Sequence, residues 1–225
     1  MAEPPTSRVS ARGRPPRVTA ERVRQAILEI EGEVPTMASL ARQLDVGVAT
    51  LYSHVRGQDE LRRLAADVAF DAWVLPPAPP GIHWAHWLFE YARDARRLTE
   101  RHPAVHGARP LTGGQLRYVE RVLAQLTGFG MSSGEALYAF VQVALLILGV
   151  GAQIEATRVE EAQAGLDTWG LFQAALSRHQ GDLPVLSGLA HDGIPDPDTS
   201  FDELVWFTLT GIARRRGEVL PTQLP

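Results

Sequence analysis

The sequence predicts an all-α protein in which a small N-terminal helical domain precedes a larger C-terminal helical bundle. Apolar residues recur at the spacing of helical turns along most of the chain, and no segment alternates apolar and polar residues as a half-buried strand would. Hydrophobic residues make up 45% of the chain and charged residues 21%, shares that are typical of a folded globular protein. Clusters of proline and glycine separate the helical segments and divide the chain into its two parts.

The N-terminal domain is expected over residues 19–75. Thr19 and Thr36 each precede an apolar-periodic segment and are suited to capping a helix. Val46 and Gly47 mark a tight turn, and Gly57 ends the short segment that follows. Three helices are therefore predicted over residues 19–30, 36–44 and 48–55, followed by a connecting helix over 58–74. The proline-rich stretch 76–81 then stops helix formation.

The C-terminal domain is expected over residues 82–225. Its helices are predicted over residues 84–102, 115–128, 133–157, 159–179 and 201–216, and the stretch 181–200, rich in glycine, proline and aspartate, is expected to be a mobile loop. The most apolar run, 136–154, is only just long enough to cross a membrane. Because Gln142 and Gln153 interrupt it and it lacks aromatic or basic anchors, we expect a buried helix and no membrane contact.

The composition excludes several classes of protein. The absence of cysteine rules out disulfides, cysteine-ligated zinc and a thiol nucleophile, and no apolar signal segment lies near Met1, so we expect a cytoplasmic protein. The net charge of -4 argues against a non-specific polycation. Residues 1–18 nevertheless form a basic, proline-containing arm, which is expected to be disordered when free.

Residues 36–54 have the outline of a helix-turn-helix motif. Leu51 and Val55 lie four residues apart and are expected to pack inward. An outer surface of small and hydrogen-bonding groups remains, formed by Val48, Ala49, Thr50, Tyr52, Ser53 and His54. The major groove of DNA, about 12 Å wide, admits such a helix. From the spacing alone, an ordinary αα-hairpin is an equally good interpretation.

The arm contributes a second DNA-binding signal. Arg12-Gly13-Arg14-Pro15 is the core of the AT-hook pattern, in which arginine side chains enter a narrow minor groove. The match is weak by itself, but its place directly before a helix-turn-helix gives it weight, because homeodomain-type arms use the same arrangement. Arg17 in the arm and Arg56 before the connecting helix are further candidate DNA contacts.

The segment 39–55, SLARQLDVGVATLYSHV, resembles the DNA-binding signature of the TetR family of transcriptional repressors. Its most specific part is Leu51-Tyr52-x-His54-Val55, followed by Asp59-Glu60-Leu61, and a looser similarity to the tetracycline-repressor subgroup continues through the C-terminal domain. The resemblance implies a homodimer, an inverted-repeat operator in double-stranded DNA, and a small-molecule effector that releases the DNA. No cofactor is implied.

The resemblance also assigns positions. The positions at which the family contacts its operator correspond here to Thr36, Val48, Ala49, Thr50, Tyr52 and His54. The chain departs from the family pattern in three places, with Asp45 at the usual turn glycine, Gly47 at the usual capping serine and Gln58 at the usual phosphate-binding lysine. At most one of the family's tetracycline and metal ligands is kept, so a bulkier or more apolar aromatic effector is expected.

A stripe of aromatic residues marks the candidate effector site. Trp84, Trp87 and Tyr91 share one face of a predicted helix, a pattern that more often belongs to an ordinary core than to a ligand site. The candidate effector contacts are Trp87, Tyr91, His106, Arg109 and Phe140. The dimer is expected to use the helices over 159–179 and 201–216. Its candidate contacts are Leu166, Leu171, Leu176, Leu204, Phe207 and Leu209.

Three other classes of function fit the sequence less well than a DNA-binding regulator. An enzyme is disfavoured, because no Gly-x-Ser-x-Gly elbow, phosphate-binding glycine loop or His-Glu-x-x-His helix is present. The spaced pairs His83/His86 and His102/His106 are more consistent with solvated or hydrogen-bonded histidines than with a metal site. A helical adaptor whose N-terminal hairpin binds protein remains the alternative to a DNA-binding regulator.

Overall fold

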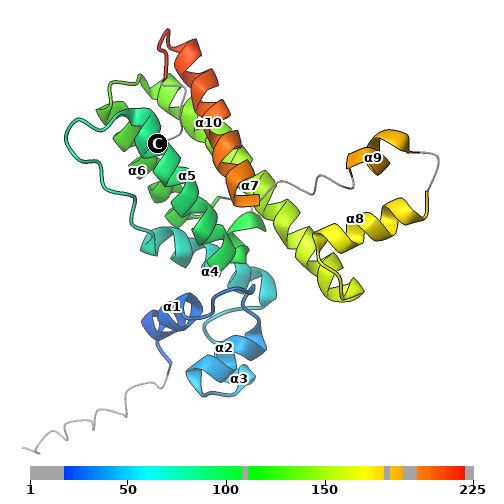
Figure 1. The fold of residues 1–225 in the computed structure, drawn as a ribbon. Helices are drawn as coiled ribbons and strands as arrows, with labels where there is room; N and C mark the ends of the chain where they lie inside the picture. The colour runs from blue at the N-terminus through cyan, green and yellow to red at the C-terminus, as the bar shows by residue number, and fades with distance from the viewer. Residues whose placement is uncertain (1–17, 108–110, 180–182, 190–196, 221–225) are drawn as a thin grey trace, which may run out of the picture.

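The computed structural model describes residues 18–107, 111–179, 183–189 and 197–220. Within those ranges the regular structure is helical throughout, which confirms the predicted all-α class. The N-terminal head consists of α1 (Ala20–Leu28), α2 (Met37–Leu44) and α3 (Val48–Leu51), and α4 (Gln58–Ala72) connects it to the rest of the protein (Figure 1).

The C-terminal body is a bundle built around a long helix. Its core helices are α5 (Trp84–Arg101), α6 (Gly113–Gly128), α7 (Ser133–Ala164) and α10 (Pro197–Arg215), and a short 3-10 helix, η1 (Pro103–Gly107), follows α5. Two further helices, α8 (Thr168–Ser177) and α9 (Pro184–Leu189), follow α7 and project away from the bundle (Figure 1).

Polar side chains start the helices where the sequence predicts. Thr19 accepts a hydrogen bond from the backbone N–H of Arg22, and Thr36 forms a reciprocal capping box with Ser39. These bonds satisfy N–H groups that a helix leaves free in its first turn. The first helix of the head and the turn into its second helix are thereby fixed by residues local in sequence.

Two main apolar cores hold the head and the body. Leu40, Leu51, Val55 and Leu61 are completely buried in the head. Ala104 of η1 belongs to the same core, so the head packs directly against the body. The backbone N–H of Gly32 also donates to the carbonyl oxygen of Arg101, at 2.7 Å, and ties the loop after α1 to the end of α5.

The structure corrects the expected helices after residue 150. The predicted break near residue 158 is absent, and α7 continues to Ala164, because the first helix-ending signal is Gly165 in the left-handed conformation (φ 66°). Asp167 then caps α8, so the helix expected over 159–179 is divided in two. The expected loop over 181–200 contains α9, while 190–196 lie outside the described residues.

Helix α7 also differs from the buried helix that the apolar run predicts. It is long and apolar enough to cross a membrane, judged by length and composition only, yet 22% of its most apolar window is buried within the chain. Leu137, Val141 and Leu145 lie exposed along it. The apolar composition of α7 therefore serves both the core of the body and an exposed face.

Candidate functional site

The candidate reading surface lies on α3 and the turn that follows it. Leu51 and Val55 are fully buried, as their spacing predicts, and they turn the intervening residues outward. Val48, Ala49, Thr50, Tyr52, Ser53 and His54 are all exposed, and Tyr52 has 57% of its surface open to solvent. The regular helix ends at Leu51 rather than Val55, but hydrogen bonds from His54 and Val55 to the Leu51 carbonyl continue its turn.

Asp45 takes over the geometry that glycine usually provides at such a turn. It ends α2 in the left-handed conformation (φ 54°, ψ 51°), which costs energy for a residue with a Cβ atom but is tolerated best by Asn and Asp. Its N–H donates to the carbonyl of Arg42. The turn is preserved, and it carries an exposed carboxylate next to the reading surface.

Gln58 stands where the family usually has a lysine, and its side chain forms hydrogen bonds with backbone groups of the same chain. The amide donates to the carbonyl of Pro35 at 2.6 Å and accepts from the N–H of Met37 at 3.3 Å. Gln58 therefore fastens the start of α4 to the start of α2. Thr36 and Arg56 are both exposed near this junction, and the hydroxyl of Thr36 accepts from the N–H of Ser39.

Arg42 was not singled out from the sequence. It is exposed in the last turn of α2 and lines an open hollow at the helix-helix turn together with Asp45 and Thr50. A basic residue just before the turn of a helix-turn-helix is the signal that would have found it. Arg12, Arg14 and Arg17 lie outside the described residues.

A cavity of about 200 Å³ lies inside the body, lined by side chains of α4, α5, η1, α6 and α7. Tyr91, His106 and Phe140, three of the candidate effector contacts, line it. Sequence reasoning did not single out four other lining residues, because they come from helices far apart in the chain. These residues are Phe70, Trp73, Gln115 and Tyr118.

Trp87 lies behind the cavity rather than in its lining. Its indole is fully buried, stacks on the Tyr91 ring with 5.6 Å between centroids, and donates to the carbonyl of Pro76 at 3.0 Å. The core interpretation of the aromatic stripe therefore describes Trp87, whereas Tyr91 faces the cavity. Arg109 lies outside the described residues.

Two tyrosines form the polar centre of the cavity wall. The phenol groups of Tyr91 and Tyr118 are hydrogen-bonded to each other, and both side chains are buried. Burial raises the pKa of both phenols above the ordinary tyrosine value, so both are protonated at neutral pH. Trp73 stacks on both rings, at 5.4 Å from Tyr91 and 5.0 Å from Tyr118.

His106 reaches the cavity because α7 carries a glycine opposite it. A Cβ atom at Gly151 would lie 2.2 Å from Cε1 of the His106 ring, far inside contact distance. Among the described lining residues there is no Arg, Asp or Glu. The described wall of the cavity is thus largely aromatic and aliphatic, and His106 is its only imidazole.

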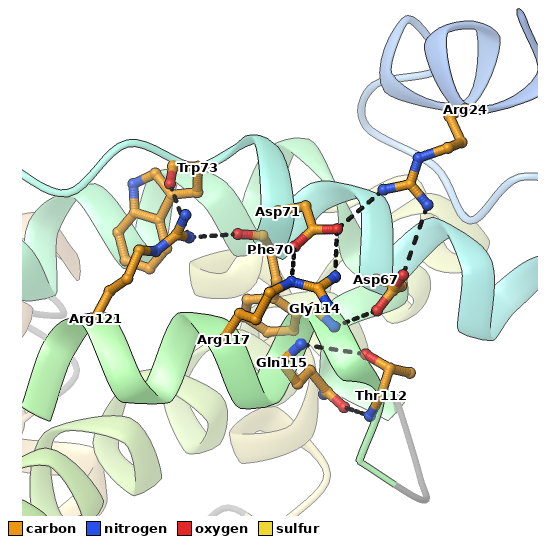
Figure 2. A network of polar contacts seen from close by, with 10 residues as sticks. All are labelled: Arg24, Asp67, Phe70, Asp71, Trp73, Thr112, Gly114, Gln115, Arg117 and Arg121. Carbon is orange, nitrogen blue, oxygen red and sulfur yellow. Dashed lines mark hydrogen bonds and ion pairs between the residues drawn. The ribbon is translucent and has the colours of Figure 1, made fainter. Parts of the chain in front are cut away.

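A polar network joins the cavity to the head (Figure 2). Asp71 of α4 accepts two hydrogen bonds from Arg117 of α6, at 2.7 and 3.0 Å, and one from Arg24 of α1 at 3.0 Å. The hydrogen bonds from Arg117 are the main reason that the pKa of Asp71 lies below its ordinary value. One carboxylate therefore contacts both a helix of the head and a helix that lines the cavity.

Two further contacts fix α6 against α4. The side chain of Asp67 accepts from the backbone N–H of Gly114 at the start of α6, and also lies 3.7 Å from the guanidinium of Arg24. Arg121 donates to the carbonyls of Phe70 and Trp73 at the end of α4, at 2.8 and 3.1 Å (Figure 2). Because α6 also carries Gln115 and Tyr118, a shift of the cavity wall displaces the partners of α4.

Comparison with known proteins identifies the family. Residues 76–215 match the model of the tetracyclin repressor-like C-terminal domain. This chain belongs to the TetR family of transcriptional regulators. A helix-turn-helix transcriptional regulator from Saccharopolyspora erythraea is 27% identical to this TetR-family chain over 186 residues, which cover 81% of the chain and 77% of that relative.

Solved structures of the TetR family share the fold. ActR of Streptomyces coelicolor, in complex with actinorhodin, is 25% identical with a TM-score of 0.65, and the match covers 88% of this chain and 96% of ActR. A TetR variant of Acinetobacter baumannii in complex with minocycline is 21% identical with a TM-score of 0.62, over 92% and 98% of the two chains. The family consists of regulators rather than enzymes.

Proposed function

We propose that this TetR-family regulator is a homodimeric repressor, released from an inverted-repeat operator by a small, largely apolar or aromatic effector. The observation that carries the proposal is the exposed set of hydrogen-bonding groups held over two buried anchors, Leu51 and Val55. Tyr52, Ser53 and His54 offer hydroxyl and imidazole groups to base edges and phosphates, while Val48 and Ala49 offer apolar contact to thymine methyl groups. The arm residues Arg12, Arg14 and Arg17 add minor-groove contacts.

Exposed apolar residues support the dimer. Leu145 on α7 and Phe207 on α10 expose 63% and 73% of their surfaces, and Leu204 exposes 46%. Exposed apolar side chains that gather on neighbouring helices are typical of an interface that another chain covers. Leu176 and Leu209, expected as dimer contacts, are buried within the chain itself, so the interface we propose uses α7 and the outer face of α10.

The cavity supports the proposal that a small-molecule effector binds in the body. Its volume of about 200 Å³ exceeds the roughly 150 Å³ of an apolar protein cavity that binds benzene, so a compact aromatic compound fits without a change of shape. ActR binds actinorhodin within the same fold. The effector acts in this proposal by favouring a position of α6 that disfavours the operator-binding spacing of the two heads, about 34–36 Å in B-form DNA.

Operator selection tests the DNA half of the proposal. The full-length protein is incubated with random duplexes, and an inverted repeat is expected among the recovered sequences. Tyr52→Ala should weaken binding to the recovered site about tenfold without changing the circular-dichroism spectrum, because an exposed base contact is worth roughly 1–3 kcal/mol. Tyr138→Phe, on α7, is the control.

Salt dependence separates this proposal from the protein-binding adaptor. DNA binding through phosphates weakens steeply as salt rises, and removal of residues 1–17 should reduce that slope. An apolar contact with a protein strengthens or stays constant under the same change. If no duplex is bound at low salt, the operator assignment is wrong and the adaptor becomes the better interpretation.

A further inference from the structure

The tyrosine pair in the cavity has one more donor than it can use. Two protonated phenols carry two O–H groups, but a single hydrogen bond between them uses only one. The phenol that accepts within the pair keeps its own proton. Among the described residues, neither Tyr91 nor Tyr118 has another hydrogen-bond partner, so this second O–H is left without an acceptor.

The other polar side chains among the described lining residues are Thr99, His106 and Gln115. The side-chain oxygen of Gln115 accepts from the backbone N–H of Thr112 at 2.8 Å. The hydroxyl of Thr99 donates to the carbonyl of Arg96 at 2.8 Å. Gln115 and Thr99 thus bond backbone groups and not the tyrosine pair.

The remainder of the wall is flat and apolar. Phe70, Trp73 and Phe140 contribute rings around the phenols, with Phe140 at 6.1 Å and Phe70 at 4.8 Å from the Tyr118 ring. An ionised carboxylate in this place would be removed from water, and no described arginine lines the cavity to pair with it. An uncharged ligand avoids that cost.

From this arrangement we infer that Tyr91 and Tyr118 form a hydrogen-bond-donating site for a neutral, flat aromatic ligand with a carbonyl oxygen. The inference rests on the proposed effector function and names the chemical class of that effector. The ligand's ring lies among Phe70, Trp73 and Phe140, and its oxygen accepts the O–H that the tyrosine pair leaves over. The buried donor is then satisfied, which is the source of selectivity for a carbonyl over a hydrocarbon of the same shape.

Three matched two-ring probes test the site. Indanone carries the carbonyl oxygen, indane lacks it, and indane carboxylate carries a charge. Binding to the full-length protein is measured by isothermal titration calorimetry. We expect indanone to bind about tenfold more tightly than indane, the ratio for one buried hydrogen bond gained, and the carboxylate to bind more weakly than either.

Tyrosine-to-phenylalanine variants assign the donor. Tyr91→Phe and Tyr118→Phe each leave one phenol whose proton is no longer shared, so each single variant should keep the preference for indanone. The double variant has no phenol at this place, and its preference should fall to about one. Tyr138→Phe is the matched control, because this exposed ring lies under the Arg215 guanidinium and outside the cavity.

Indane also reports whether the double variant is folded, since its binding needs only the apolar wall. Equal binding of indanone and indane by the wild-type protein would overturn the inference, as would a preference that survives in the double variant. Binding of none of the probes would overturn it as well. Operator binding by the same samples is measured in parallel, so a failure of the DNA-binding function is recognised separately.

Discussion

The head carries the candidate reading surface and the body contains the cavity, and the residues that form these two features are distributed differently along the chain. The reading surface is a continuous stretch, residues 48–54, displayed by two buried anchors one turn apart. The cavity combines side chains that range from Phe70 to Leu148 and belong to several helices. A surface can therefore be encoded locally, whereas a cavity depends on how helices distant in sequence pack.

The contact between α4 and α6 connects the head to the cavity. Among the substitutions considered, Gly114→Ala should disrupt this contact most and cause the largest loss of stability. A Cβ atom there would lie 2.5 Å from the backbone oxygen of Asp67, so α6 must move away from α4. Overpacking of this kind costs roughly 1–3 kcal/mol. We expect that loss in chemical denaturation, together with a weaker effect of ligand on operator binding.

Gly134→Ala is the control for that experiment. Gly134 is likewise the second residue of its helix, and an added Cβ atom meets nothing within 4 Å. Its substitution should leave stability unchanged or slightly higher, because alanine favours helix over glycine. If both variants lose the same stability, the close approach of α6 to α4 does not explain the loss at Gly114.

Asp71→Asn should weaken the coupling between the cavity and the head, at a smaller cost in stability than Gly114→Ala. The substitution removes the charge that Arg24 and Arg117 share, while the exposure of these side chains limits the loss to about 1 kcal/mol. Operator affinity and probe binding should each persist, but a bound effector should release the operator less well. Asp202→Asn, at a similarly exposed ion pair with Arg93, should leave release unchanged.

The pH dependence of stability sharpens this prediction. The pKa of Asp71 is lowered in the folded protein, mainly by hydrogen bonds from Arg117, so its contribution is complete above the ordinary carboxyl pKa. The contribution is lost as the pH falls through the lower, folded value. The difference in Tm between the wild type and Asp71→Asn should therefore be constant from neutral pH to about pH 5 and shrink below about pH 4.

Asp45→Gly should have the smallest effect and act on the head alone. Glycine adopts the left-handed conformation without the cost that a Cβ atom brings, so stability should rise by about 0.5 kcal/mol. Operator affinity should also rise, because an exposed negative charge is removed beside the reading surface. Asp45→Asn tests the charge separately from the backbone conformation, and an unchanged affinity in both variants would show that the carboxylate lies away from DNA.

Much of the head could be predicted from sequence because its signals are local. Thr19 and Thr36 start their helices as expected, and Leu51 and Val55 are the buried anchors. The predicted end of α7 near residue 157 was wrong, because no glycine or proline lies between Gly151 and Gly165 to end the helix there. The expectation that α7 is buried failed for a different reason, since apolar composition does not distinguish a core from a surface that another chain covers.

The cavity was only partly predictable. Tyr91 was identified from aromatic spacing, but the same spacing included Trp87, which the turn of α5 directs into the core. Tyr118 and Trp73 could not be paired with Tyr91, because nothing in their local sequence shows that α4, α5 and α6 meet at one point. Periodicity gives the face of a helix, and packing decides what that face meets.

The glycine opposite His106 makes α7 one of the elements that set the size of the cavity. A side chain at position 151 would collide with the His106 ring, so the imidazole would have to move and the space of the cavity would change without any change to its aromatic rings. Under the proposed function, a single added methyl group on one helix would retune effector selectivity by volume, while the residues proposed to contact DNA stay the same.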